Sequence, residues 1–183
     1  YLCGNVADFW TSSNVFYIMV NTTSGPRFFY GYSNDVEQML RMRKSYSEDV
    51  LDDGKRDRLQ DLSYMSHPSG DFIDMSCSDD HLAFLMKEKD STSVQTCGSN
   101  KFFKCGSTAT KPLSNYFNAS KFCHIRDKIK AVACTLKSTI VLSFSSDTSQ
   151  LHKIGGSTNY SVQKVDLIAP ACKLCSFYSS QDV

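Results

Sequence analysis

Short apolar segments bounded by polar turn residues recur along the chain and predict β-strands. Residues 15–20 are apolar at every position, and residues 28–32 follow them after the turn signal Ser24-Gly25-Pro26. Apolar runs of this length, rich in β-branched and aromatic residues, are typical of buried strands. The sequence therefore predicts a β-hairpin over residues 15–32.

Later segments carry the same pattern. Residues 72–77 and 82–86 predict a second strand pair, and residues 131–136 and 139–144 predict a third. A last strand is predicted over residues 160–168, where a bulge would decide which side chains face inward. No internal repeat is apparent in the sequence.

Three other segments show helical spacing. Residues 34–46 open with Asn34, a good N-cap, and residues 57–65 and 113–130 place apolar side chains three or four positions apart. Residues 88–112 are polar and are predicted to form a long loop region held by disulfides. Helices followed by strand pairs, rather than alternating with single strands, indicate an α+β fold.

The predicted fold class is therefore α+β, with a mixed, mainly antiparallel β-sheet, two or three helices, long loops on one face and disulfide staples. The chain has 183 residues, the length of one domain, and residues 1–183 are predicted to form a single glycosylated ectodomain. No apolar run approaches the roughly 18 residues of a membrane span, so no direct membrane insertion is expected.

Eight cysteines and three glycosylation sequons indicate an oxidising compartment. An even number of cysteines spread along a chain is typical of a disulfide framework, and N-x-Ser/Thr tripeptides mark surface positions in secreted proteins. The alternatives are a cytosolic protein with free thiols and a metal site. The predicted disulfide cysteines are Cys3, Cys77, Cys97, Cys105, Cys123, Cys134, Cys172 and Cys175, and the predicted N-glycosylation sites are Asn21, Asn118 and Asn159.

No catalytic or metal-binding constellation stands out. Cys172 and Cys175 form a C-x-x-C pair, which follows a proline in the tail and fits structural half-cystines better than a redox motif. The four histidines are scattered and match no zinc spacing. A net charge of +1 does not provide the basic surface that nucleic acid binding needs. We therefore expect no enzyme activity, no cofactor, no metal and no nucleic acid partner.

Three groups of residues occur in an order that matches a known family. They are Leu2-Cys3 followed by Tyr17-Ile18-Met19-Val20 and the Asn21 sequon, the segment 53–66 leading to Met75-Ser76-Cys77, and Ala133-Cys134 with the late Cys172. Together they resemble the receptor-binding (attachment) subunit of an arenavirus envelope spike glycoprotein, and the chain looks like a divergent member of that family.

The resemblance implies a function and partners. The chain would be the viral spike subunit that mediates attachment of the virion to a host cell-surface receptor protein. It would sit non-covalently on the membrane-anchored fusion subunit of the same spike, which is trimeric on the virion. It would be made through the host secretory pathway and lie on the extracellular face of the virion envelope and of the infected host cell membrane. Cys3 would pair with Cys172 or Cys175.

The chain also departs from the family's pattern. Some relatives place a pH-sensing histidine cluster at positions that hold Val15, Phe16 and Ala171 here, so the resemblance does not extend to that switch. The aromatic residues Tyr30 and Tyr32 are candidate receptor contacts, because tyrosine is favoured in binding hot spots. The alternative interpretation is that both tyrosines are ordinary strand residues on a half-buried face.

Two other classes of function stay open. The alternative to viral attachment is a secreted disulfide-rich binding protein, such as a parasite or tick effector that captures a host protein. The third hypothesis is a secreted enzyme, which would need a pocket with convergent titratable groups.

Overall fold

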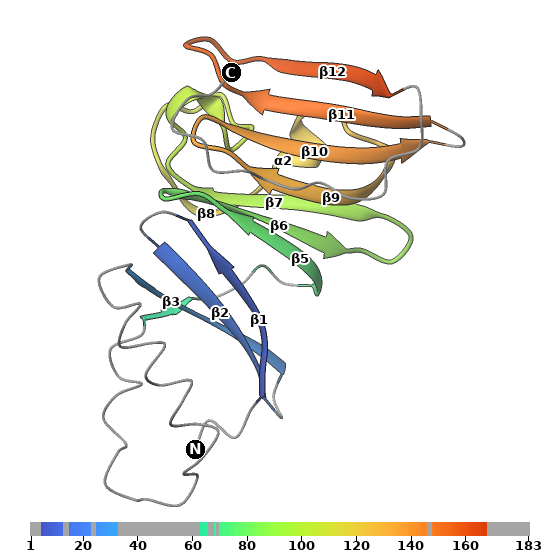
Figure 1. The fold of residues 1–183 in the computed structure, drawn as a ribbon. Helices are drawn as coiled ribbons and strands as arrows, with labels where there is room; N and C mark the ends of the chain where they lie inside the picture. Colours follow the sequence, from blue (N-terminus) through green and yellow to red (C-terminus); the bar gives the residue numbers. More distant parts are fainter. Residues whose placement is uncertain are drawn as a thin grey trace, which may run out of the picture. The chain divides into compact units, whose positions relative to one another are not determined.

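The computed structural model describes residues 5–12, 15–22, 25–32, 63–65, 68, 70–145 and 148–167. The chain divides into two compact units, Tyr1–His67 and Pro68–Val183, and each is described by itself. The described elements are almost all β-strands, which form three antiparallel sheets of four strands each (Figure 1). The two units are a finer division than the single ectodomain expected over residues 1–183, which stays a prediction.

In each sheet, strands that are neighbours in the sequence pair with one another. The first unit holds β1 (Asn5–Thr11), β2 (Val15–Thr22), β3 (Gly25–Tyr32) and β4 (Ser63–Met65). The second unit holds β5 (Asp71–Cys77), β6 (His81–Lys87), β7 (Thr92–Gly98) and β8 (Leu113–Asn118), then β9 (Lys128–Cys134), β10 (Ser138–Ser145), β11 (Thr148–Gly155) and β12 (Val162–Leu167).

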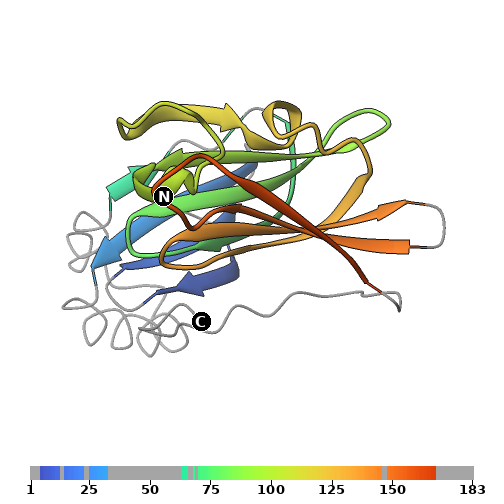
Figure 2. The ribbon, with the colours of Figure 1, turned by 90° about the horizontal axis from the view of Figure 1, so that it is seen from above.

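The two sheets of the second unit pack through strand β9, which lies against β5, β6 and β7 (Figures 1 and 2). Their shared core draws on both sheets and on the segment that joins them. Leu85 and Val94 come from one sheet and Val141 and Ile154 from the other, while Ile125 comes from the connection. Burial of such side chains contributes roughly 1.5–3 kcal/mol each, so this core holds the two sheets together.

The three sheets repeat one plan. Each begins with a strand of seven residues, β1, β5 or β9, whose third residue has no direct partner on the next strand. The bulged residues are Ala7, Ile73 and Lys130. A β-bulge bends its strand and increases the local twist, so the same distortion recurs at the same place in every sheet.

The turn after this first strand repeats as well. The backbone N–H of Ser12 donates to the carbonyl of Val15 at 2.9 Å, and the equivalent bonds Ser78–His81 and Thr135–Ser138 measure 2.9 and 2.8 Å. A hydroxyl residue opens the turn each time. The following hairpins also have equal span, because residues 15 and 32, 81 and 98, and 138 and 155 pair directly. The chain therefore contains structural repeats that do not stand out as sequence repeats.

The predicted helices are wrong where the structure describes them. Residues 113–130, expected to be one helix, form strand β8, the four-residue helix α2 (Ala119–Phe122), and the start of strand β9. Residues 63–65, at the end of a second predicted helix, form strand β4. The helix expected over residues 34–46 lies outside the described residues. The α+β prediction is therefore wrong, and the described part of the chain is a β-sheet protein.

The predicted long loop over residues 88–112 is also wrong in its first half. Strand β7 (Thr92–Gly98) lies between β6 and β8, and the short 3-10 helix η3 (Lys101–Phe103) follows it. The buried polar residue Thr96 is accommodated in this central strand because its hydroxyl is hydrogen-bonded within the fold. Thr96 Oγ1 donates to the carbonyl of Cys105 at 2.7 Å, and buried polar groups that are hydrogen-bonded carry little penalty.

No disulfide staples the described part of the chain. Its cysteines all carry free thiols. Cys77 and Cys134 occupy equivalent positions in successive repeats, at the end of β5 and β9, and Cys134 is part of the core cluster. Cys134 therefore serves as a small core side chain, whereas Cys77 is half-buried. The Cys3 pairing implied by the family resemblance involves residues outside the described part.

Candidate functional site

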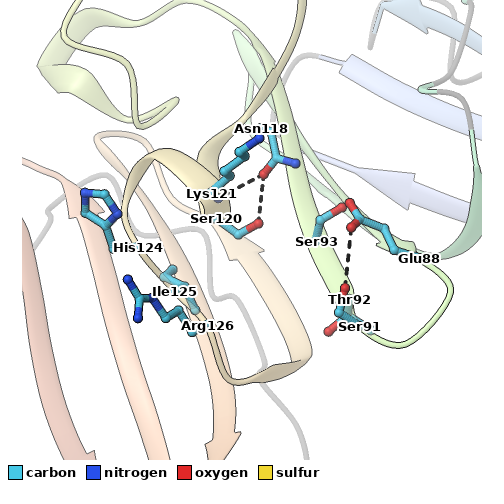
Figure 3. Close-up of a pocket in the computed structure, with 10 residues that line it drawn as sticks. All are labelled: Glu88, Ser91, Thr92, Ser93, Asn118, Ser120, Lys121, His124, Ile125 and Arg126. Carbon is cyan, nitrogen blue, oxygen red and sulfur yellow. Dashed lines mark hydrogen bonds between the residues drawn. The ribbon is translucent and has the colours of Figure 1, made fainter.

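A polar pocket of about 400 Å³ lies within the second unit (Figure 3). One wall comes from the β6–β7 turn and the start of β7, and the other comes from α2 and the turn that follows it. Ile125 is the single aliphatic residue among those that line it. The lining residues are Glu88, Ser91, Thr92, Ser93, Asn118, Ser120, Lys121, His124, Ile125 and Arg126.

Local capping explains how α2 presents its side chains. Asn118 caps the helix, and its side-chain Oδ1 accepts the backbone N–H of Lys121 at 2.9 Å. His124 ends the segment in the left-handed region, with φ 56°, a conformation in which histidine is enriched among non-glycine residues. This reversal places Lys121, His124 and Arg126 along one wall of the pocket (Figure 3).

Several oxygen atoms of the pocket are already used within the fold. Thr92 Oγ1 accepts the N–H of Ile129 at 2.6 Å and donates to its carbonyl at 2.9 Å. Ser120 Oγ accepts the N–H of Val94 at 3.1 Å and donates to Asn118 Oδ1 at 2.9 Å. These bonds fix the two walls and leave few acceptors for a ligand.

The groups without a partner are mainly donors. Lys121, His124 and Arg126 are exposed, and none of them makes an ion pair or side-chain hydrogen bond with the described residues. Ser93 Oγ is buried, and no described group hydrogen-bonds to it. The carboxylate of Glu88 accepts from Ser91 Oγ at 3.4 Å. Two cations and one carboxylate therefore line the pocket.

A second polar cluster joins the two sheets and is structural. His81 is 1% exposed, with its Nδ1 2.5 Å from Ser78 Oγ and its Nε2 3.0 Å from Thr139 Oγ1. Thr139 Oγ1 in turn donates to the carbonyl of Lys104 at 2.7 Å. The buried Lys104 ammonium donates to the Asp80 carboxylate. This network is internally satisfied, so we assign it to packing between sheets.

Burial and neighbouring charges shift the pKa values in this network. Burial lowers the pKa of His81, and the nearby Lys104 ammonium lowers it further. Together they outweigh the Asp80 carboxylate, which acts to raise that pKa. Burial alone would raise the pKa of Asp80, but the hydrogen bonds from His81 and Lys104 overcome it and hold that pKa well below its usual range. At neutral pH the network therefore holds a neutral imidazole beside an Asp80–Lys104 ion pair.

The remaining histidines fall in different places. His152, on β11, is buried and its Nε2 lies 2.8 Å from Ser143 Oγ; burial lowers its pKa. His124 lines the pocket, and His67 lies outside the described residues. The sequence did not single out Lys121, His124 and Arg126, although two cations and a histidine within six residues were a readable signal.

The predicted glycosylation sites occupy different surroundings. Asn21 and Asn159 are exposed, whereas Asn118 lines the pocket and its sequon hydroxyl, Ser120, is 3% exposed. Among the candidate receptor contacts, Tyr30 is half-buried with its ring centroid 6.2 Å from that of Tyr17. The side chain of Tyr32 lies outside the described part. Glycosylation and receptor contact at these positions stay predictions.

Where the structure describes them, the cysteines predicted to form disulfides carry thiols of low reactivity. Burial raises the pKa of Cys77 and of Cys105 to about 12, and that of Cys97 to about 11. Burial also raises the pKa of Cys123 and Cys134. Thiols of this kind are poor nucleophiles because the thiolate is the reactive form.

Comparisons with known proteins identify the fold and no family. No family model matches the chain, and no curated protein matches it. Among solved structures, the crystal structure of human WBSCR16 resembles it with a TM-score of 0.52 and 14% sequence identity, over 88% of this chain and 39% of that one. At this identity the likeness concerns the fold alone. None of these findings bears on the resemblance to the arenavirus attachment subunit.

The described residues show neither a metal site nor a membrane-spanning helix. They contain no group of three or more His, Cys, Asp or Glu side chains that could hold a metal ion. Within the same ranges, no helix is both long and apolar enough to cross a membrane.

Proposed function

We propose that this chain is a non-enzymatic binding module that holds a segment of a partner protein. Its sheets are consecutive four-stranded antiparallel repeats, an architecture found in blades of β-propellers. Rigid repeats of this kind carry their variable insertions as loops on a binding face. The proposal keeps what the viral attachment and secreted binding hypotheses share, which is recognition of another protein.

The observation that carries the proposal is the pocket beside α2. Its walls are fixed by hydrogen bonds between β7, β9 and α2, while Lys121, His124 and Arg126 have no described partner. By contrast, the buried histidines His81 and His152 are bonded to hydroxyl groups inside the fold. Three side chains without a described partner therefore line one polar pocket that is open to solvent, as in a recognition site.

Selection of random peptides displayed on phage tests the proposal. The full chain serves as bait, and the matched bait carries Arg126→Ala together with Lys121→Ala. We expect peptides that bind the natural chain with micromolar affinity and lose that affinity on the double variant. Peptides that bind both baits equally, or no enriched peptide at all, would contradict a binding module that uses this pocket.

Attachment to a host receptor remains the more specific form of this proposal. It rests on the family resemblance. Expression of the natural gene with its flanking sequence tests it, because a spike subunit would be released from a precursor that also encodes a fusion subunit. A gene that encodes no such partner would favour the secreted binding protein instead.

A further inference from the structure

We infer that the pocket beside α2 binds an anionic group, a carboxylate or a phosphate carried by an acidic peptide segment of a partner protein. The inference rests on the proposed binding function and names the chemistry of its ligand. It follows from which polar groups of the pocket are already engaged and which are not.

The engaged groups are mostly acceptors. Asn118 Oδ1 accepts two hydrogen bonds, one from the N–H of Lys121 and one from Ser120 Oγ, both at 2.9 Å. Thr92 Oγ1 is held by the backbone of Ile129. A ligand that enters the pocket to donate hydrogen bonds would therefore find few open acceptors besides the Glu88 carboxylate.

The groups that stay open are donors. They comprise the Lys121 ammonium, the Arg126 guanidinium and the amide Nδ2 of Asn118, none of which has a hydrogen-bond or ion-pair partner among the described residues. A guanidinium presents a planar fork of N–H groups that matches carboxylate and phosphate oxygens. Donors and cations without partners, on one wall, call for an acceptor-rich and negatively charged ligand.

Ser93 supplies an independent observation. Its residue is 4% exposed, its Oγ has under 1 Å² of accessible surface, and no described group bonds to that oxygen although Ser93 lines the pocket. A buried hydroxyl without a hydrogen-bond partner destabilises the fold. A ligand acceptor that reached this hydroxyl would therefore satisfy a group that the fold leaves unsatisfied.

The size and lining of the pocket favour a short polar group over an apolar ligand. Its volume of about 400 Å³ lies at the small end of ligand pockets, and Ile125 is its single aliphatic lining residue. The opening is flanked by the exposed β6–β7 turn, residues 88–91. An extended peptide lying across this turn could place one glutamate or phosphoserine side chain in the pocket.

Nuclear magnetic resonance titration of the full chain tests the inference. The probes are a short glutamate-rich peptide, the same peptide with one phosphoserine, and a glutamine-rich peptide of equal length. We expect saturable shifts of the backbone amides of residues 91–93 and 118–126 with the two acidic peptides and none with the glutamine peptide. The tighter of the acidic probes identifies whether carboxylate or phosphate is preferred.

Variants that change the charge of the pocket test whether its affinity for the acidic peptides depends on positive charge. Arg126→Gln and Lys121→Gln should each weaken binding about tenfold, because each removes a charged hydrogen bond to the ligand. Glu88→Gln should strengthen binding, since it removes the facing negative charge. Lys111→Gln makes the same charge change at an exposed position that does not line the pocket, and it should leave the affinity unchanged.

Three results would overturn the inference. They are an absence of shifts at these residues, weaker binding by Glu88→Gln, and equal losses in Lys111→Gln and Lys121→Gln, which would indicate diffuse attraction to surface lysines. The proposed function fails differently. Pocket-dependent peptides without acidic residues would leave the binding module intact and refute the anionic ligand, whereas saturable acidic shifts without any selected peptide would support the anion site and refute the protein-binding module.

Discussion

Substitution of Gly155 by alanine should destabilise the second unit more than an ordinary glycine substitution. Gly155 ends strand β11 at φ +80° and meets the loop that contains η3. A Cβ placed there would lie 2.5 Å from the carbonyl oxygen of Phe102 and 2.8 Å from the backbone N and Cα of Lys104. Since all three atoms belong to backbone, no side-chain rotation can relieve the contact.

The expected cost has two parts. An alanine in the left-handed region costs about 1–2 kcal/mol. Moving the loop away from the new methyl group adds about 1–3 kcal/mol for overpacking, and it endangers the bond from Gly156 N–H to the Phe102 carbonyl, 3.1 Å long and worth about 1 kcal/mol. We therefore expect a total near 3–5 kcal/mol.

Gly70→Ala is the matched control within the same unit. Gly70 also has a positive φ, +128°, but its added Cβ would meet only ordinary contacts, the nearest being Met86 Cε at 3.6 Å. This variant should therefore show the backbone cost without the steric cost. The difference between the two variants isolates the contact between the β11 end and the η3 loop.

Hydrogen exchange of the β10 and β11 amides in urea measures the free energy of unfolding of the second unit. Trp10, the single tryptophan of the chain, lies in the first unit. Its fluorescence therefore reports separately on the stability of the first unit. Equal losses for Gly155→Ala and Gly70→Ala would refute the steric argument. A loss for Gly155→Ala seen first in Trp10 fluorescence would refute its assignment to the second unit.

Three further predictions concern the interior of the second unit. First, burial lowers the pKa of His81 below its unfolded value, so the stability that its neutral form confers is complete above about pH 6.5 and is lost as pH falls. The free energy of unfolding measured in urea should therefore decrease toward acidic pH, and His81→Gln should reduce this decrease. Second, Asp80→Ala leaves the buried Lys104 ammonium without its counter-charge, whereas Lys104→Met removes the buried charge, so calorimetry should find the former less stable by about 2 kcal/mol. Third, because Cys97 and Cys105 carry buried thiols with raised pKa, iodoacetamide without reductant should label them fully in urea and only slowly in the native chain; thiols that resist labelling in urea would instead indicate a disulfide.

The strands that the sequence predicted well are those with continuous apolar runs. The hairpins β2–β3, β5–β6 and β9–β10 were all expected near their observed bounds. Strands β7 and β11 were missed because their inward positions include Ser93, Thr96, Ser149 and His152, all buried. A polar residue at a core position gives no hydrophobic signal, and the hydrogen-bond partners of Thr96 and His152 come together only in the folded chain.

The helix predicted over residues 113–130 failed for a related reason. Its apolar residues fit a helical stripe, but Asn118 acts as a cap in the middle of the segment and His124 reverses the backbone. Both local features compete with a continuous helix. Asn118 and His124 also line the pocket. The wrong helix prediction and the failure to predict the pocket therefore both come from these two local features.

The repeats were readable in part. At an offset of 57 residues, Cys77, Leu85 and Gly98 recur as Cys134, Leu142 and Gly155. Most other positions differ, because equivalent places are fixed by geometry, such as the bulge and the hydroxyl turn, which several residue types satisfy. Fourteen residues separate β7 from β8 but six separate β11 from β12 (99–112 against 156–161), and this unequal spacing hides the period.

The Asn118 sequon and the proposed anion pocket make opposing demands on one side chain. N-glycosylation attaches the sugar to the side-chain amide nitrogen, and in this structure that nitrogen belongs to a residue lining the pocket while Oδ1 caps α2. A glycan on Asn118 would therefore fill the site that an acidic segment is proposed to occupy. Mass spectrometry of the Asn118 peptide from chain secreted by eukaryotic cells decides between them. We expect Asn118 to be unmodified in molecules that bind the acidic peptide, and a fully glycosylated Asn118 in binding-competent protein would contradict the pocket's assignment.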